Sequence, residues 1–139
     1  MRNVLIDAGP LIALFAPDDR HHDRVDAHVL ALTEGGLRLL TTWPCVVEAA
    51  YLLEARQRFE MLRWIELGGV QVYRFEPHHL GAMIGWMERY TERGKREMDL
   101  ADASLYWLAA ETGIRDILTI DLRDFRRYRL PDGQPFILL

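Results

Sequence analysis

Two acidic residues directly follow short apolar segments that have the pattern of buried strands. Asp7 comes after residues 4–6, and Asp121 comes after residues 117–120. In open α/β sheets the ligand site lies beyond the carboxyl ends of the strands. We therefore expect both carboxylates at the edge of the sheet where such folds carry out their chemistry.

Further acids interrupt apolar helical patterns. Glu48 lies within the apolar segment 46–53, where a carboxylate is costly to bury unless something compensates its charge. Asp99 and Asp102 stand near the start of the segment 98–112, three residues apart, so a helix there places both on one face. These positions suggest a shared function rather than ordinary surface acids.

Carboxylates that converge from four segments repel one another, and a divalent cation relieves that repulsion. Magnesium and manganese prefer oxygen ligands, and magnesium keeps several bound waters. Such an ion orients water, lowers its pKa and neutralises the charge that builds up on a phosphoryl oxygen. A carboxylate that is not a ligand could deprotonate the attacking water. The acids thus indicate a Mg²⁺ or Mn²⁺ site suited to phosphoryl chemistry.

Each acid also has a purely structural interpretation. Asp7 could cap the helix that follows it, and Asp99 could be an N-cap with Asp102 in the favourable first turn. Asp121 could shape a turn, and Glu48 could pair with an arginine. Taken together, two acids at strand ends and two on apolar helical faces call for a common cause.

The elements that must position these acids alternate along the chain. Strand patterns cover residues 4–6, 37–41, 70–75, 117–120 and 136–139. Helical patterns cover residues 10–15, 46–53, 59–67, 77–90 and 98–112, and Thr42 is the expected N-cap of the second of these helices. A further helix, capped by Asp18 or Asp19, ends near Gly35. This alternation predicts an α/β fold with a parallel sheet covered by helices on both faces, and the length fits one domain over residues 1–139.

Composition narrows the class of protein further. The net charge of −4 argues against binding nucleic acid through bulk positive charge, although local arginines can still hold phosphates. The single cysteine, Cys45, excludes an intrachain disulfide and favours a reducing compartment. No signal-peptide core and no apolar stretch of membrane-spanning length is present in the sequence. We expect a cytoplasmic protein with no membrane association.

Basic and aromatic residues near the acids allow two interpretations each. Basic residues beside Asp121 and Asp99 could hold phosphates or could belong to solvated turns. They are Arg123, Arg126, Arg127 and Arg129 on one side, and Arg93, Lys95 and Arg96 on the other. Met83, Trp86, Met87 and Tyr90 have helical spacing. This stripe is expected to pack inside the protein, with a dimer face as the alternative.

The sequence resembles PIN domains, specifically the VapC-like toxins of bacterial and archaeal toxin–antitoxin pairs. The resemblance rests on four ordered motifs that span the chain: VLIDAGPLIALF (4–15), TWPCVVEA (42–49), MDLADASL (98–105) and LTIDLRDF (118–125). It implies a three-layer α/β/α sandwich with a central parallel sheet and Mg²⁺- or Mn²⁺-dependent cleavage of RNA.

The resemblance also assigns roles to particular residues. The family's acidic positions match Asp7, Glu48, Asp102 and Asp121 as catalytic residues, with Asp7, Asp99, Asp102 and Asp121 as metal ligands and Thr119 and Asp124 in support. Ala8 departs from the Ser or Thr that the family commonly has after the first Asp. The family further implies a homodimer and a cognate antitoxin that inhibits the toxin. Alternatives are a PIN-fold binding module without activity, and a metal-dependent phosphoesterase or DNA nuclease.

Overall fold

Five parallel strands form one sheet at the centre of the computed structural model, which describes residues 1–92 and 96–139. The strands are β1 (Arg2–Ile6), β2 (Leu37–Thr42), β3 (Gln71–Tyr73), β4 (Asp116–Leu118) and β5 (Ile137–Leu138), in the spatial order β3-β2-β1-β4-β5. In the register, Leu5 lies opposite Leu40 of β2 and Ile117 of β4. The first strand is therefore central, and Asp7 leaves the sheet at its middle.

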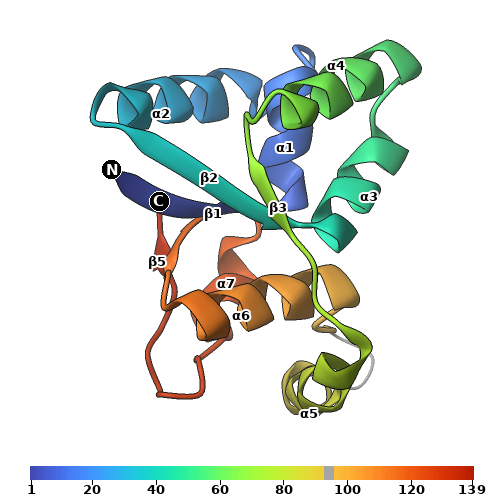
Figure 1. Cartoon of the computed structure of the whole chain (residues 1–139), viewed down its shortest axis with the longest axis vertical. Helices are drawn as coiled ribbons and strands as arrows, with labels where there is room; N and C mark the ends of the chain where they lie inside the picture. Colours follow the sequence, from blue (N-terminus) through green and yellow to red (C-terminus); the bar gives the residue numbers. More distant parts are fainter. Residues whose placement is uncertain (93–95) are drawn as a thin grey trace.

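Helices cover both faces of the sheet (Figure 1). Those on one side are α1 (Ala8–Phe15), α2 (His22–Glu34), α3 (Trp43–Leu52) and α4 (Ala55–Glu66). Those on the other side are α5 (Leu80–Tyr90), preceded by the short 3₁₀ helix η1 (Pro77–His79), then α6 (Leu100–Thr112) and α7 (Leu122–Arg127). The predicted three-layer α/β/α sandwich with a parallel sheet is confirmed. Among the described residues, no helix combines the length and apolarity needed to cross a bilayer.

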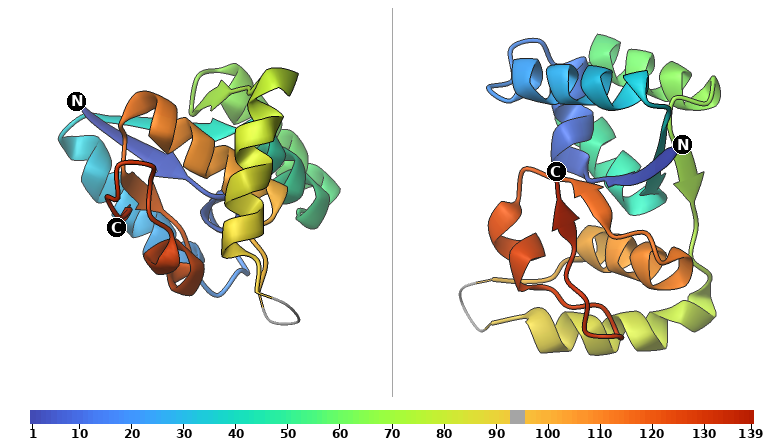
Figure 2. Two further views of the ribbon diagram at one scale, coloured as in Figure 1. Left: turned by 90° about the horizontal axis from the view of Figure 1, so that it is seen from below. Right: turned by 90° about the vertical axis from the view of Figure 1, so that its left-hand side faces the viewer.

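Helix α6 is the most deeply buried helix among the described residues. It lies between the sheet and α5, as the right-hand view of Figure 2 shows, and every residue from Ala101 to Ala109 is buried. Strand β1 supplies the other side of this core, since Val4, Leu5 and Ile6 are fully buried. A buried strand and a buried helix therefore carry Asp7 and Asp102, so neither carboxylate can reach bulk solvent freely.

The stripe on α5 packs inward, as the sequence suggested. Met83 and Tyr90 are buried, and the Trp86 ring centroid lies 4.5 Å from that of Tyr106 on α6. These side chains complete the core beneath α6. Trp86 and Met87 are half-buried and pack against the same core, and the alternative of a dimer face stays a prediction.

The starts of two helices differ from the prediction. Helix α2 begins at His22, because the Asp19 carboxylate accepts the His21 backbone N–H within the preceding turn instead of capping the helix. Helix α4 begins at Ala55, ahead of the predicted residue 59. Glu54 and Gln57 form a reciprocal capping box there, which starts the helix before its apolar pattern is apparent.

The segment around Asp121 also differs from the prediction. Strand β4 ends at Leu118, so Asp121 follows it after two further residues rather than directly. Asp121 is the N-cap of α7, a helix that the sequence pattern did not predict. Its six residues are too few for a helical period to stand out.

Candidate metal centre

Seven acidic side chains line one pocket of about 390 Å³ at the carboxyl edge of the sheet. They come from the end of β1, from α3, from α6 and the segment before it, and from the start of α7. These acids are Asp7, Glu48, Glu97, Asp99, Asp102, Asp121 and Asp124. The structure thus brings together all the acids that the sequence singled out. It adds Glu97, which no pattern distinguished from the other charges of its loop.

Asp7 is held from two sides. Its Oδ1 accepts the Ala8 N–H at 2.8 Å, which makes Asp7 the N-cap of α1, and its Oδ2 accepts the Thr119 hydroxyl at 3.0 Å. The Thr119 hydroxyl oxygen also accepts the Asp121 backbone N–H at 3.0 Å. Asp7 therefore does cap a helix, but the same contacts orient it toward the pocket and tie the ends of β1 and β4 together.

Asp102 stands in the first turn of α6 and is buried. Its Oδ2 accepts a hydrogen bond of 2.6 Å from the Tyr128 hydroxyl. Its backbone N–H donates to Asp99 Oδ1 at 2.8 Å, which makes Asp99 the N-cap of the helix. The capping interpretation of Asp99 is correct, yet its exposed side chain also lines the pocket.

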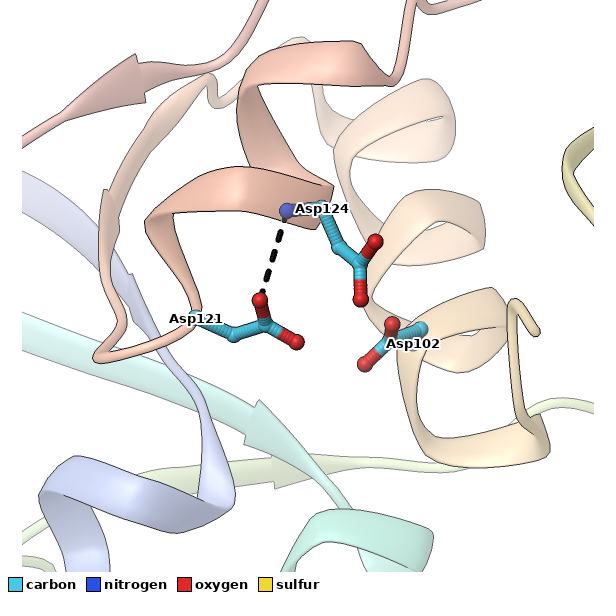
Figure 3. Close-up of side chains that lie close together, drawn as sticks. All are labelled: Asp102, Asp121 and Asp124. Atoms are coloured by element: carbon cyan, nitrogen blue, oxygen red, sulfur yellow. Dashed lines mark hydrogen bonds between the residues drawn. The ribbon is translucent and has the colours of Figure 1, made fainter. Parts of the chain in front are cut away.

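Three carboxylates form the tightest group (Figure 3). One oxygen from each of Asp102, Asp121 and Asp124 lies within 4.8 Å of the other two, and the three side chains point into a common space. The Asp124 N–H donates to Asp121 Oδ1 at 3.3 Å, which fixes the two acids of α7 relative to each other. Asp124, predicted as a supporting residue, therefore belongs to this group, whereas the predicted ligands Asp7 and Asp99 lie outside it.

Burial and mutual repulsion favour the protonated forms of these acids. Burial raises the pKa of Asp102 to about 8, repulsion from Asp7 adds to it, and the Tyr128 hydrogen bond opposes it. Burial likewise raises the pKa of Asp7 to about 6, against the hydrogen bonds from Ala8 and Thr119. The pKa of Asp121 is raised mainly by burial and then by Asp124.

This donor set fits a hard divalent cation. All the side chains offer oxygen, the ligand that Mg²⁺ and Mn²⁺ prefer, and no histidine lines the pocket in the described part of the chain. A bound cation would stabilise the ionised carboxylates that burial otherwise disfavours. The pocket is therefore suited to bind a divalent cation.

Glu48 faces the pocket from α3 and is exposed, and no arginine among the described residues pairs with it. Its pKa is raised, first by partial burial and then by repulsion from Asp99. A carboxylate of raised pKa at the rim of the site can accept a proton from water.

Buried hydroxyls hold the helices that carry these acids. The Thr41 hydroxyl donates to the Ile6 carbonyl at 2.7 Å, at the end of β1. Thr42 stands at the N-cap position of α3, but its side chain does not cap the helix. It shares a hydrogen bond of 2.5 Å with Ser104 Oγ on α6 instead. This contact joins the helix of Glu48 to the helix of Asp102.

The predicted phosphate-binding arginines have different surroundings. Arg127 is engaged within the protein: its Nη2 lies 3.3 Å from Asp124 Oδ1, and its guanidinium lies over the rings of Tyr90 and Tyr128. Arg127 is thus a partner of Asp124 in this structure, and its contact with phosphates stays a prediction. Arg123 and Arg126 are exposed and Arg96 is half-buried, while Arg93 and Lys95 lie outside the described residues.

An apolar groove of about 730 Å³ adjoins the acid pocket and shares Glu48 and Asp99 with it. The side chains of Trp43, Val47 and Tyr51 line it from one side of α3, and all three are exposed. Exposed apolar surface of this kind is typical of an interaction site.

Several solved structures share this fold. One is VapC20 of Mycobacterium tuberculosis, a toxin that cleaves the sarcin–ricin loop, with 18% identity, a TM-score of 0.68 and coverage of 82% of this chain and 86% of the other. Another is VapBC2 from Rickettsia felis bound to a DNA fragment from its promoter, with 15% identity, a TM-score of 0.64 and coverage of 99% and 98%. No family model matches the sequence, and no curated protein matches it.

At these identities the likeness establishes the fold. The chain has the VapC-like PIN fold that its motifs predicted, over nearly its full length.

Proposed function

We propose that this chain of VapC-like PIN fold is a divalent-metal-dependent endoribonuclease, the toxin of a toxin–antitoxin pair. The observation that carries the proposal is the single pocket lined by seven acids from distant parts of the chain. Carboxylates gathered in this way cost stability, so their assembly favours a use that needs them.

Six of the seven acids then have a role in the hydrolysis of an RNA phosphodiester bond. Asp102, Asp121 and Asp124 would hold the cation, with Asp7 and Asp99 at the edges of the same pocket. A bound Mg²⁺ or Mn²⁺ supplies a water of lowered pKa and neutralises charge on the phosphoryl oxygen. Glu48 accepts the proton of the attacking water from its position at the rim. Thr119 keeps Asp7 in place through its 3.0 Å hydrogen bond.

RNA is the proposed substrate because VapC20, which shares the fold, cleaves the sarcin–ricin loop. The net charge of −4 makes nonspecific attraction to the phosphate backbone weak. Arg123, Arg126, Arg127 and Arg96 are the proposed local phosphate contacts beside the acids.

The proposed protein partner is an antitoxin, as in the VapBC2 complex. The apolar groove beside Glu48 and Asp99 supports a protein partner, because an exposed aromatic and aliphatic surface suits an apolar segment better than it suits water. A homodimer and a cytoplasmic location complete the proposal, and sedimentation of the purified chain measures the first of these.

Cleavage of RNA by the purified protein tests the proposal. Single-stranded RNA, a transfer RNA and single-stranded DNA are incubated with Mg²⁺, with Mn²⁺ or with EDTA. We expect cleavage of RNA that needs the metal and falls at least ~100-fold in Asp102→Asn and in Asp7→Asn, because each variant removes a charge from the cation site. Asp26→Asn, an exposed acid on α2, is the matched control and should keep full activity.

Three results would count against the proposal. If folded Asp102→Asn cleaved RNA as fast as the wild-type protein, the acids would have no role in the reaction. Cleavage of DNA in preference to RNA would favour a DNA nuclease. Absence of cleavage of all three substrates by a protein that binds Mn²⁺ would favour a binding module of the same fold.

A further inference from the structure

Tyr128 connects the segment after α7 to the acid on α6. Its side chain is fully buried, and its hydroxyl donates to Asp102 Oδ2 at 2.6 Å. Among the described residues it is the single hydrogen-bond donor to this carboxylate. No sequence pattern pointed to Tyr128, which stands beyond the four motifs of the resemblance.

The ring of Tyr128 has little freedom to move. It packs edge-on against Tyr90, with 5.0 Å between ring centroids, and against Phe125, at 5.1 Å. The guanidinium of Arg127 lies 5.4 Å from its centroid. Because packing fixes the ring, the direction of the hydroxyl bond is fixed as well, and so is the oxygen of Asp102 that the hydroxyl occupies.

Arg127, the residue before Tyr128, contacts a second acid of the group, Asp124. Arg127 Nη2 lies 3.3 Å from Asp124 Oδ1. Two adjacent residues at the end of α7 thus contact two of the three carboxylates that form the tight group.

The backbone that carries this pair is itself anchored. The Arg129 N–H donates to the Tyr90 hydroxyl oxygen at 3.0 Å. The Arg129 carbonyl accepts hydrogen bonds from two hydroxyls, those of Tyr90 and Tyr106, so loss of the Tyr106 hydroxyl leaves the Tyr90 bond in place. The segment after α7 is therefore a rigid support behind the acids rather than a free connection.

We propose that Tyr128 is a positioning residue for metal binding, which holds Asp102 by its Oδ2 so that the other carboxylate oxygen faces the cation. The inference rests on the proposed metal site and adds a residue that acts through a ligand. Hydrogen-bond partners of metal ligands commonly change metal affinity by 10–100-fold when they are removed. A buried tyrosine hydroxyl needs some acceptor in any case, so the test must separate positioning from ordinary stabilisation.

Tyr106 provides the matched control for that separation. It is also fully buried, in the same aromatic cluster, but its hydroxyl donates to the Arg129 backbone carbonyl and to no acid. Tyr128→Phe and Tyr106→Phe each remove one buried hydroxyl and keep the ring. Both should lower the melting temperature of the metal-free protein by about the same amount, since each variant loses one buried hydrogen bond.

Titration calorimetry in the absence of RNA measures the affinity of each variant for Mn²⁺. We expect the Mn²⁺ dissociation constant to rise at least ~10-fold in Tyr128→Phe and to stay within about twofold of wild type in Tyr106→Phe. The Mn²⁺ resonance in electron paramagnetic spectra should broaden in Tyr128→Phe, since the carboxylate is no longer held in one orientation.

Unchanged Mn²⁺ affinity in Tyr128→Phe would overturn the inference, and so would an equal loss in both variants. Failure of the wild-type protein to bind Mn²⁺ would overturn it together with the metal site. Because no RNA is cleaved in this experiment, a protein that binds Mn²⁺ but lacks nuclease activity would sink the proposed function and leave the role of Tyr128 intact.

Discussion

Individual carboxylates in this pocket are held at a cost to folding. Asp102 is buried among other acids, and its pKa of about 8 means that the metal-free protein keeps it largely protonated at neutral pH. The Tyr128 hydroxyl lowers this cost but does not remove it. Residues of this kind are expected where function, rather than stability, decides the side chain.

The stability of the metal-free protein should therefore depend on pH through Asp102. Its pKa is about 3.8 when unfolded and about 8 when folded, so the folded state binds the extra proton between these values. The stability that this proton provides is complete below the unfolded pKa and is lost as the pH rises through the folded pKa. Asp102→Asn stays neutral throughout and avoids this loss.

We expect Asp102→Asn to melt at nearly the same temperature as wild type at pH 4, and at least ~3 °C higher at pH 8.5, both in EDTA. Thermal unfolding followed by circular dichroism measures this difference, and Asp26→Asn serves as control. A difference that stays constant with pH, or that reverses sign, would show that Asp102 is not a buried acid of raised pKa.

At the scale of elements, helix starts meet at the acid pocket. Asp7, Asp99 and Asp121 are the N-caps of α1, α6 and α7, and each side chain accepts a backbone N–H of its helix. Helix N-termini carry partial positive charge, so they offset part of the repulsion among the acids. The same arrangement of helix starts therefore makes these three residues N-caps and places them in the acid pocket.

The contact between α3 and α6 gives a prediction at this scale. Thr42→Val removes a buried hydroxyl that shares a 2.5 Å hydrogen bond with Ser104 and keeps nearly the same shape. We expect it to lower the free energy of unfolding by about 1–2 kcal/mol, measured by urea denaturation. Thr33→Val removes an exposed hydroxyl that bonds within α2 and should cost less than about 0.5 kcal/mol. Equal effects of both variants would show that the Thr42 contact does not hold the helices together.

Elements with a clear apolar pattern could be predicted from the sequence, and elements too short for such a pattern could not. The buried strand before Asp7 and the apolar helix around Asp102 were predictable, because each segment consists mainly of apolar residues. Helix α7 was not predicted because its six residues hold too few turns for a period. Tyr128 was missed for a different reason: its contact with Asp102 joins residues 26 positions apart and depends on the tertiary packing of α7.

At the scale of the whole molecule, strand order decides which acids meet. The order β3-β2-β1-β4-β5 places β1 beside both β2 and β4, so Asp7 and the residues after β4 leave the sheet side by side. Helix α3 follows β2 and α6 lies against the sheet, which brings Glu48 and Asp102 to the same edge. Carboxylates far apart in sequence are thereby drawn to one place by a topology that the apolar core determines.

Crystals of the protein soaked in Mn²⁺ would test that convergence most directly, through the anomalous scattering of the ion. We predict a peak among Asp102, Asp121 and Asp124, with carboxylate oxygens at roughly 2.0–2.6 Å, and its loss in Asp102→Asn crystals. Ordered crystals that show no peak in the acid pocket, or a peak that persists in the variant, would contradict the account.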